Sequence, residues 1–440
     1  MTGALQAPLG TADPRSVSSV PGVRVVLDAR PLQEPARAPL TAAYLDGLLG
    51  AFDEMPVDGE SFALLLQSDL DDPTERFEHL SVVGRRLLPP TRFLRSGALT
   101  IDPFLLSGAS LGAAWRAERA GASGAVYHAV GGSIPLATGL PLVVTLLDLA
   151  PWELPGAYQR GTAARFGQRL RGRLLRDASA VIVGSEAVAA AARRLLHLRR
   201  DRIRVVALAP RPAFGLNPGG QARRRGRTPP RVEDPRADRE RLGLPERYVI
   251  YSGRYDARQD LTTLLKALAA LGAEGRPAGL PEDVPWPPRV LFAGASPDDR
   301  AALARAAARE GVGETIAYSP SLDDERLAGL VRGARVAILP VVSDSTGLPA
   351  IEAIASGVPV IASAVGSLPE IVGGAGIIVE PRDANRLSSA IATAFVDDRV
   401  HAGFAAVARE RAESEQRSWL DVARETRAIY AEVASPAGRD

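Results

Sequence analysis

The sequence predicts an α/β protein with two doubly wound parallel-sheet domains that face each other across a cleft. Short β-branched runs alternate with Ala/Leu/Arg-rich helical patterns, which is typical of βα units in a parallel sheet. This alternation is interrupted by a stretch rich in Pro, Gly and Arg at 211–245, and it then restarts. The chain has 440 residues, more than one ordinary core accommodates, so at least two domains are expected.

The expected strands are short apolar runs rich in Val, Ile, Leu and Ala. In the first half of the chain they are 23–29, 61–67, 125–130, 142–149, 178–184 and 203–208. In the second half they are 248–252, 289–294, 315–318, 334–339, 358–363 and 376–379.

The segments between and around these strands give the domain boundaries. Residues 1–22 lack the basic start and long apolar block of a secretory signal. They are expected to be a disordered tail instead. The first domain is predicted over 23–210, the linker over 211–245 and the second domain over 246–414.

The composition limits the class of function. Hydrophobic residues make up 46% and charged residues 24%, as in a folded protein, and no apolar run is long enough to span a bilayer. Without cysteine, thiolate chemistry and zinc–thiolate sites are excluded, and we expect a cytoplasmic protein. The net charge of +2 argues against a nucleic-acid partner. The arginine run at 223–227 is either a solvated linker or a peripheral contact with anionic lipid headgroups at the inner membrane face.

Several common motifs are absent or out of place. Lys266 is the only lysine and no Gly-Lys pair exists, so the chain has no Walker A loop. No GxGxxG fingerprint of an NAD enzyme is found. The sequence GASLG at 108–112 matches the serine-hydrolase elbow, but it runs into a helical pattern without a clear strand before it. The four histidines are scattered, and we predict neither a metal site nor a cofactor.

One stretch combines features of a ligand site. In SDSTGLPAIEAIASGVPV, a glycine turn at Gly347 opens a short helix, and Pro349 suits a first turn that needs no amide proton. The free N–H groups at such a helix start attract phosphate, and the carboxylates of Asp344 and Glu352 can accept hydrogen bonds from sugar hydroxyls. The pattern therefore favours a nucleotide-sugar. The alternative is that Glu352 only stabilises its own helix.

The same residues resemble the nucleotide-sugar glycosyltransferases of group 1, also called family 4, whose hallmark reads like EGFGLPxLEAMAxGxPV. Here DSTGLPAIEAIASGVPV continues into PVIASAVGSLPEIVGGAGIIVEPRDANRLSSAI, which follows the family pattern closely. RYVIYSGRYDARQDLTTLLKAL resembles the strand–GR–helix unit that opens the second domain. VVLDARPL, VYHAVGGSIPL and PLVVTLLDLAPWELP fall in the order of the first domain. The resemblance implies the GT-B fold over nearly the whole chain. It also implies that residues 415–435 form a C-terminal helix that crosses back to the first domain.

The resemblance also implies roles for individual residues. The donor nucleotide-sugar would contact one set, with Asp344 on the sugar, Glu352 on the ribose and Arg254 on the diphosphate: Gly253, Arg254, Gln259, Gly347, Leu348, Pro349 and Glu352. The acceptor would lie near a second set in the first domain: Tyr44, His128 and Asp148. The implied catalytic residues are Asp344, Arg254 and Asp148.

This chain departs from the family pattern at four of these positions. Asp344 replaces the first glutamate of the hallmark, and Gln259 replaces a lysine that normally holds the diphosphate. Leu147 replaces a histidine beside Asp148, and the glycine-rich loop after the first strand reads LTAAY, with only Tyr44 kept.

Two functions follow from the resemblance and its departures. The first is a retaining, metal-independent glycosyltransferase that moves a sugar from a nucleotide-sugar donor to a glycan or lipid-linked saccharide. The alternative is a non-catalytic GT-B protein that keeps the cleft as a binding or pairing module. The preserved second-domain motif favours the enzyme, whereas Leu147 and the LTAAY loop favour the alternative.

Overall fold

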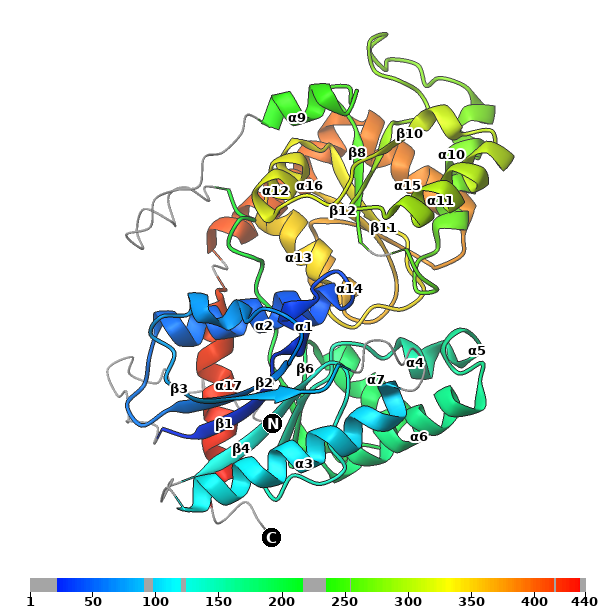
Figure 1. The fold of residues 1–440 in the computed structure, drawn as a ribbon. Helices are drawn as coiled ribbons and strands as arrows, with labels where there is room; N and C mark the ends of the chain where they lie inside the picture. Colours follow the sequence, from blue (N-terminus) through cyan, green and yellow to red (C-terminus); the bar gives the residue numbers. More distant parts are fainter. Residues whose placement is uncertain are drawn as a thin grey trace, which may run out of the picture.

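The computed structural model describes residues 22–90, 98–119, 124–216, 235–253, 255–414 and 417–435, without the side chains of 98–100, 113–119 and 235. Two α/β domains lie one above the other, each with a parallel sheet between helices (Figure 1). The predicted fold class is therefore confirmed.

The first sheet has seven parallel strands in the order β3-β2-β1-β4-β5-β6-β7. Its strands are β1 (Arg24–Asp28), β2 (Ser61–Gln67), β3 (Val82–Leu88), β4 (Ala125–Val130), β5 (Leu142–Thr145), β6 (Ala180–Val183) and β7 (Ile203–Val205). The strand order reverses direction between β1 and β4, which pair in register from Arg24 opposite Ala125. A ligand crevice is expected at that switch point, outside the carboxyl ends of the strands.

The second sheet has six parallel strands in the order β10-β9-β8-β11-β12-β13. Its strands are β8 (Val249–Ser252), β9 (Val290–Ala293), β10 (Ile316–Tyr318), β11 (Val336–Leu339), β12 (Val360–Ser363) and β13 (Gly376–Val379). The central strands are buried on both faces, which explains their uninterrupted Val/Ile/Leu sequences. Here the order reverses between β8 and β11.

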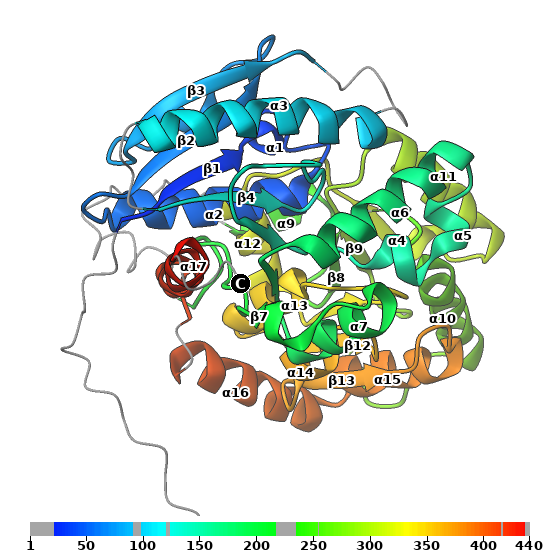
Figure 2. The ribbon, with the colours of Figure 1, turned by 90° about the horizontal axis from the view of Figure 1, so that it is seen from below.

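The helices cover both faces of the two sheets (Figures 1 and 2). Those of the first domain are α1 (Arg30–Gln33), α2 (Pro39–Glu54), α3 (Ala98–Arg119), α4 (Ala150–Glu153), α5 (Pro155–Tyr158), α6 (Thr162–Asp177) and α7 (Glu186–Leu196). The later helices are α9 (Pro235–Arg241), α10 (Leu261–Glu274), α11 (Pro297–Arg309), α12 (Asp324–Gly333), α13 (Leu348–Ala355), α14 (Leu368–Val372), α15 (Ala384–Val396), α16 (Asp398–Ser414) and α17 (Trp419–Ala434).

Local sequence signals start many of these helices. The Ser185 hydroxyl accepts the N–H of Val188 at the start of α7, and Asp323 accepts that of Arg326 at the start of α12. Each cap satisfies an amide that has no partner within its own helix. The 108–112 motif lies inside α3, so its serine is not on a nucleophile elbow.

Both ends of the predicted linker contribute to the second domain. Phe214 is buried in its core, and Arg332 donates to the carbonyl of Ala213 at 3.0 Å. At the other end, Asp238 of α9 accepts hydrogen bonds from Arg326 of α12 at 2.6 and 3.0 Å. The polar composition of 211–245 concealed these anchoring contacts. The arginine run at 223–227 lies outside the described residues, as does the predicted N-terminal tail except for Gly22.

The last helix, α17, packs on α2 and β4 of the first domain, whereas the preceding helix α16 packs on α13 and α15 of the second (Figures 1 and 2). Trp419 and Tyr430 join the core of the first domain. Arg427 forms a buried, two-pronged ion pair with Glu60 at 2.7 and 2.9 Å. Within the described residues, no helix is both long and apolar enough to cross a bilayer.

Candidate functional site

A cavity of about 1150 Å³ opens between the two domains, at the carboxyl ends of both sheets. The second domain supplies most of its wall, from the loops after β8, β9, β10 and β11. The first domain supplies the start of α2 and the loop after β5. The cavity thus lies where both strand orders predict a ligand crevice.

Asp344 lies on this wall, but one of its oxygens is already engaged. Its Oδ1 accepts the N–H of Thr346 at 2.9 Å, the N–H of Gly347 at 2.5 Å and the hydroxyl of Ser367 at 3.2 Å. Burial raises the pKa of Asp344, and these hydrogen bonds oppose that rise. Asp344 therefore shapes the turn, and the Gly347 amide that we expected to face a phosphate points to Asp344 instead.

The turn depends on glycine at two positions. Gly347 has φ of +58°, and a Cβ there would lie 2.1 Å from the Ile371 side chain. Gly366 has φ of +53°, and a Cβ there would lie 1.6 Å from the Asp344 carbonyl oxygen. Gly366 combines a left-handed backbone with a close approach to backbone, so a side chain is excluded there, whereas at Gly347 the left-handed backbone is what favours glycine. The two glycines fix Asp344 and the start of α13.

Glu352 is only 2% exposed and is held by Arg211, which the sequence did not identify. Arg211 donates from Nε at 2.5 Å and from Nη2 at 2.9 Å, and its Nη1 contacts Asp324. Burial raises the pKa of Glu352, while the Arg211 hydrogen bonds and charge lower it. Both Glu352 and Arg211 line the cavity. Glu352 therefore does more than stabilise its own helix.

A second arginine connects the two domains across the cavity. Arg258 donates to Asp256 of its own loop at 2.6 to 3.1 Å, and its Nη1 reaches Asp148 of the first domain at 3.4 Å. Asp148 also accepts the N–H of Ala150 at 2.8 Å through its other oxygen. The structure thus places the predicted Asp148 at the cavity, paired with an arginine that the sequence did not single out.

The other predicted donor residues are mostly on the cavity wall. Gly253, Gln259, Leu348 and Pro349 line it. Gln259 pairs with Val341 through a backbone bridge, which holds its loop against the loop after β11. Arg254 lies outside the described residues.

Two predicted acceptor residues lie elsewhere. His128 is fully buried in β4, with Nδ1 2.7 Å from the Tyr430 hydroxyl and Nε2 2.8 Å from the Thr145 hydroxyl. Thr145 in turn donates to the Tyr44 hydroxyl at 3.3 Å. Neither Tyr44 nor His128 lines the cavity; both belong to a polar network beneath α17. Burial lowers the pKa of His128 to about 3, so the imidazole is neutral at physiological pH.

Three further polar contacts tie the domains together beside the cavity. The N–H of Leu149 donates to Ser345 Oγ at 3.0 Å, and that of Ala187 donates to Glu370 at 2.7 Å. The Ser343 hydroxyl donates to Glu153. Leu147 presents an apolar side chain to the same space. The loop after β11 therefore carries part of the cavity wall and two of these three contacts between the domains.

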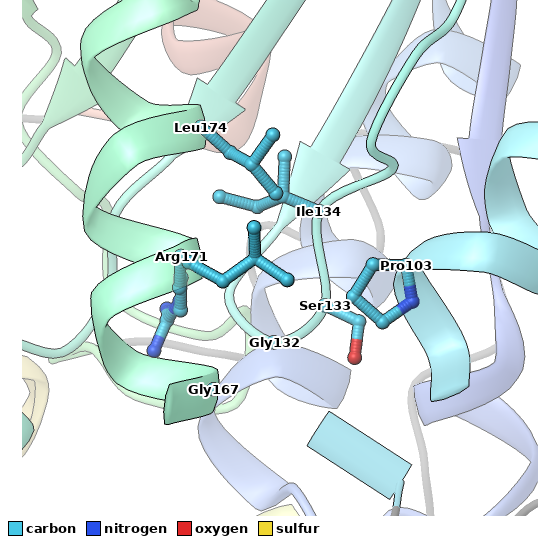
Figure 3. Close-up of a pocket in the computed structure, with 8 residues that line it drawn as sticks. Pro103, Gly132, Ser133, Ile134, Gly167, Arg171 and Leu174 are labelled. Atoms are coloured by element: carbon cyan, nitrogen blue, oxygen red, sulfur yellow. The ribbon is translucent and has the colours of Figure 1, made fainter. Parts of the chain in front are cut away.

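A much smaller cavity lies inside the first domain, between α6, α3 and the loop after β4 (Figure 3). Its volume is about 10 Å³, and Ile134, Arg171 and Leu174 are among the residues that line it. This is at most the space of one water molecule, so it is no substrate site. Among the described residues, no group of three or more His, Asp or Glu side chains is arranged to hold a metal ion.

The comparisons with known proteins agree with this geometry. Residues 246–397 match the family described as Glycosyl transferases group 1. The O-antigen chain mannosyltransferase B of Escherichia coli is 33% identical over 186 residues, which are 42% of this chain and 45% of that protein. The chain thus matches less than half the length of this curated relative.

Solved structures resemble nearly the whole chain. Sucrose-phosphate synthase from Thermosynechococcus elongatus has a TM-score of 0.66 at 22% identity and covers 93% of this chain and 99% of its own. HepE from Anabaena, solved with UDP and glucose, has a TM-score of 0.61 at 18% identity, with 92% and 99% covered. These likenesses show a shared two-domain fold. The chain therefore has the GT-B fold, and its second domain matches the family described as Glycosyl transferases group 1.

Proposed function

We propose that this chain is a glycosyltransferase that moves a sugar from a nucleotide-sugar donor to a carbohydrate acceptor. The observation that carries the proposal is the cavity of about 1150 Å³ between the two sheets, with Asp344, Glu352 and the start of α13 on its wall. A relative named as a mannosyltransferase and a neighbour solved with UDP and glucose support this class of substrate.

The second domain would bind the donor. The Glu352 carboxylate accepts hydrogen bonds from the Arg211 side chain on both oxygens and a further one from the Arg211 backbone, which leaves one lone-pair position for a ribose hydroxyl. Asp344 has one oxygen committed to the turn, which leaves Oδ2 for a hydroxyl of the sugar. The N–H of Leu348, at the start of α13, suits an oxygen of the diphosphate.

The first domain would bind the acceptor, with Asp148 at the border between the two substrates. The acceptor oxygen bonds to the anomeric carbon, the bond from that carbon to the phosphate oxygen breaks, and the acceptor proton passes to the departing phosphate oxygen. The nucleoside diphosphate leaves with the electron pair of that bond, so cations at its site lower the barrier. We further propose that the anomeric configuration is retained and that no metal is needed.

A non-catalytic GT-B protein is the second candidate. The apolar Leu147 beside Asp148 and the partly committed carboxylate of Asp344 favour it. Such a protein would bind a nucleotide or a partner without turning over a donor.

The first experiment measures thermal melting and nucleoside diphosphate release with UDP-, GDP-, ADP- and TDP-sugars. A donor at about 100 times its Kd should add about 2.7 kcal/mol of stability. E352Q should weaken this effect, whereas E325Q, at an exposed glutamate of α12, should match the wild type. A protein that is stabilised by a donor but releases no nucleoside diphosphate with any acceptor tested would favour the non-catalytic candidate. If no donor stabilises the protein, both the glycosyltransferase and a non-catalytic nucleotide-binding protein are contradicted.

Two details need separate measurements on the active donor. NMR of the product should show the donor's anomeric configuration, and an inverted product would contradict retention. The rate should be unchanged by EDTA, and a loss restored by Mg²⁺ or Mn²⁺ would contradict metal independence.

A further inference from the structure

The cavity wall carries more carboxylates than arginines, and the carboxylates would repel the diphosphate of a donor. Five carboxylates line it: Asp148, Asp256, Asp299, Asp344 and Glu352. The arginines on its described wall are Arg211, Arg258 and Arg300. A nucleotide-sugar carries its negative charge on the diphosphate, so the position of these arginines decides where that group can lie.

The three arginines differ in what holds them. Arg211 is held by Glu352 and Asp324. The guanidinium of Arg300 lies over the ring of Tyr318 at 5.2 Å from its centroid, at the side of the cavity formed after β10. Arg258 is paired with Asp256 and Asp148, and its loop lies directly against the loop that carries Asp344. Its charge also opposes the rise in the pKa of Asp344.

The backbone places Arg258 next to the glycine turn. Its carbonyl accepts the N–H of Val342 at 2.7 Å, and the N–H of Asp260 donates to the Pro340 carbonyl at 2.7 Å. These bonds hold the loop at 256–260 against the loop after β11, which carries Asp344. Arg258 is therefore held beside the loop after β11, which carries Asp344.

The Arg258 side chain can accept an additional partner. Within the described residues, the Nε–H of Arg258 is shared between both oxygens of Asp256, one hydrogen of Nη2 bonds Asp256 and one hydrogen of Nη1 bonds Asp148. One N–H therefore remains on each terminal nitrogen. The contact with Asp148 is long, at 3.4 Å, and the Asp148 side chain is 31% exposed. A phosphate oxygen can therefore join Arg258 without breaking its pair with Asp256.

We propose that Arg258 binds the diphosphate of the donor and supplies the cation that the neutral Gln259 lacks. This inference rests on the proposed function. Asp256 fixes the guanidinium in place, and the donor draws it partly away from Asp148. Donor binding then leaves the Asp148 carboxylate free to face the acceptor.

The test separates the nucleoside from its phosphates. Calorimetric titration of the wild type first selects the nucleoside diphosphate among UDP, GDP, ADP and TDP, and the matching nucleoside is then titrated. R258Q should weaken diphosphate binding about 10- to 100-fold and leave nucleoside binding within about twofold. R305Q removes a charge from an exposed position of α11 outside the cavity and should match the wild type.

Each other outcome has a distinct meaning. Equal diphosphate affinity in R258Q and wild type overturns the inference but not the proposed function. An equal loss of nucleoside and diphosphate binding also overturns it, because Arg258 then acts only on the fold. If R258Q does not fold, R258K is used instead. A diphosphate affinity within about tenfold of the wild type would support the inference, because lysine keeps the charge. A diphosphate affinity no higher than that for the nucleoside would overturn it. A wild type that binds no nucleotide overturns the proposed function together with this inference.

Discussion

At the scale of single residues, two carboxylates of the site each have a structural partner and also line the cavity. Asp344 stabilises the turn with Oδ1 while it lines the cavity, and Glu352 pairs with Arg211 while it lines the same space. The arginine partners of the cavity carboxylates are distant in sequence: Arg211 is 141 positions from Glu352, and Arg258 is 110 positions from Asp148. The sequence motif identifies the carboxylates, but their distant arginine partners can be identified only from the folded structure.

Asp344 offers a test of its structural role. D344A removes the acceptor of two turn amides, and we expect a loss of about 1–3 kcal/mol in the free energy of unfolding. D344N keeps an acceptor oxygen and should lose less. Urea unfolding of both variants checks this, and equal losses would contradict a hydrogen-bonding role.

The pH dependence of Asp344 has a defined sign. Its pKa is raised in the fold, so the folded chain holds this proton more tightly than the unfolded chain does. The contribution of Asp344 to stability therefore falls as the pH rises from its ordinary value of 3.8 toward the folded value. D344N should lack this decrease, so the stability of the wild type relative to D344N should fall over that interval.

At the scale of elements, the buried strands could be predicted and the polar ones could not. Each expected strand is present, because apolar runs such as 358–363 are buried on both sides. β3 was not predicted; it is an edge strand whose Val83 and Leu87 are exposed and whose centre is Gly-Arg-Arg. Its pattern lacks the apolar run or the alternation that identifies a strand. The polar helix α9 was missed for the same reason.

The helix α17 explains why two predicted site residues are not at the site. His128 and Tyr44 lie in order with the family's first-domain motifs, but α17 covers them and Tyr430 bonds His128. Sequence order does not reveal which face of β4 carries the imidazole. Y430F should cost about 1–3 kcal/mol, because it leaves a buried ring nitrogen without its partner.

His128 should also make the first domain sensitive to acid. Its pKa falls from 6.5 to about 3 on folding, so the unfolded chain binds the proton more tightly. The stabilising contribution is present above pH 6.5 and is lost as the pH falls toward 3. H128Q should flatten this part of a stability–pH curve measured by urea unfolding, and an unchanged curve would contradict a buried neutral imidazole.

At the scale of the whole molecule, polar contacts hold the two domains together beside the cavity. Two hydrogen bonds join the loop after β11 to the first domain: Ser343 bonds Glu153, and Ser345 bonds the amide of Leu149. Such contacts contribute about 0.5–1.5 kcal/mol each, which is little enough for a ligand to shift the domains. One loop, that after β11, therefore carries both these contacts and part of the cavity wall.

Removal of the Glu153 carboxylate tests this arrangement. E153A should loosen the loop after β11, with faster hydrogen exchange at 343–348 and a larger radius of gyration in X-ray scattering. E325A, on the exposed side of α12, serves as the control. Exchange that equals the wild type would show that the contact does not hold the domains.

The return of α17 to the first domain also sets the order in which the chain can mature on the ribosome. Domains of a nascent chain usually fold from the N-terminus onward. Here the core around Tyr44 and Phe52 is completed by Trp419 and Tyr430, which are synthesised after the entire second domain. The first domain to emerge is therefore the last to be completed, and until then its exposed apolar groove is the surface that a chaperone would have to protect.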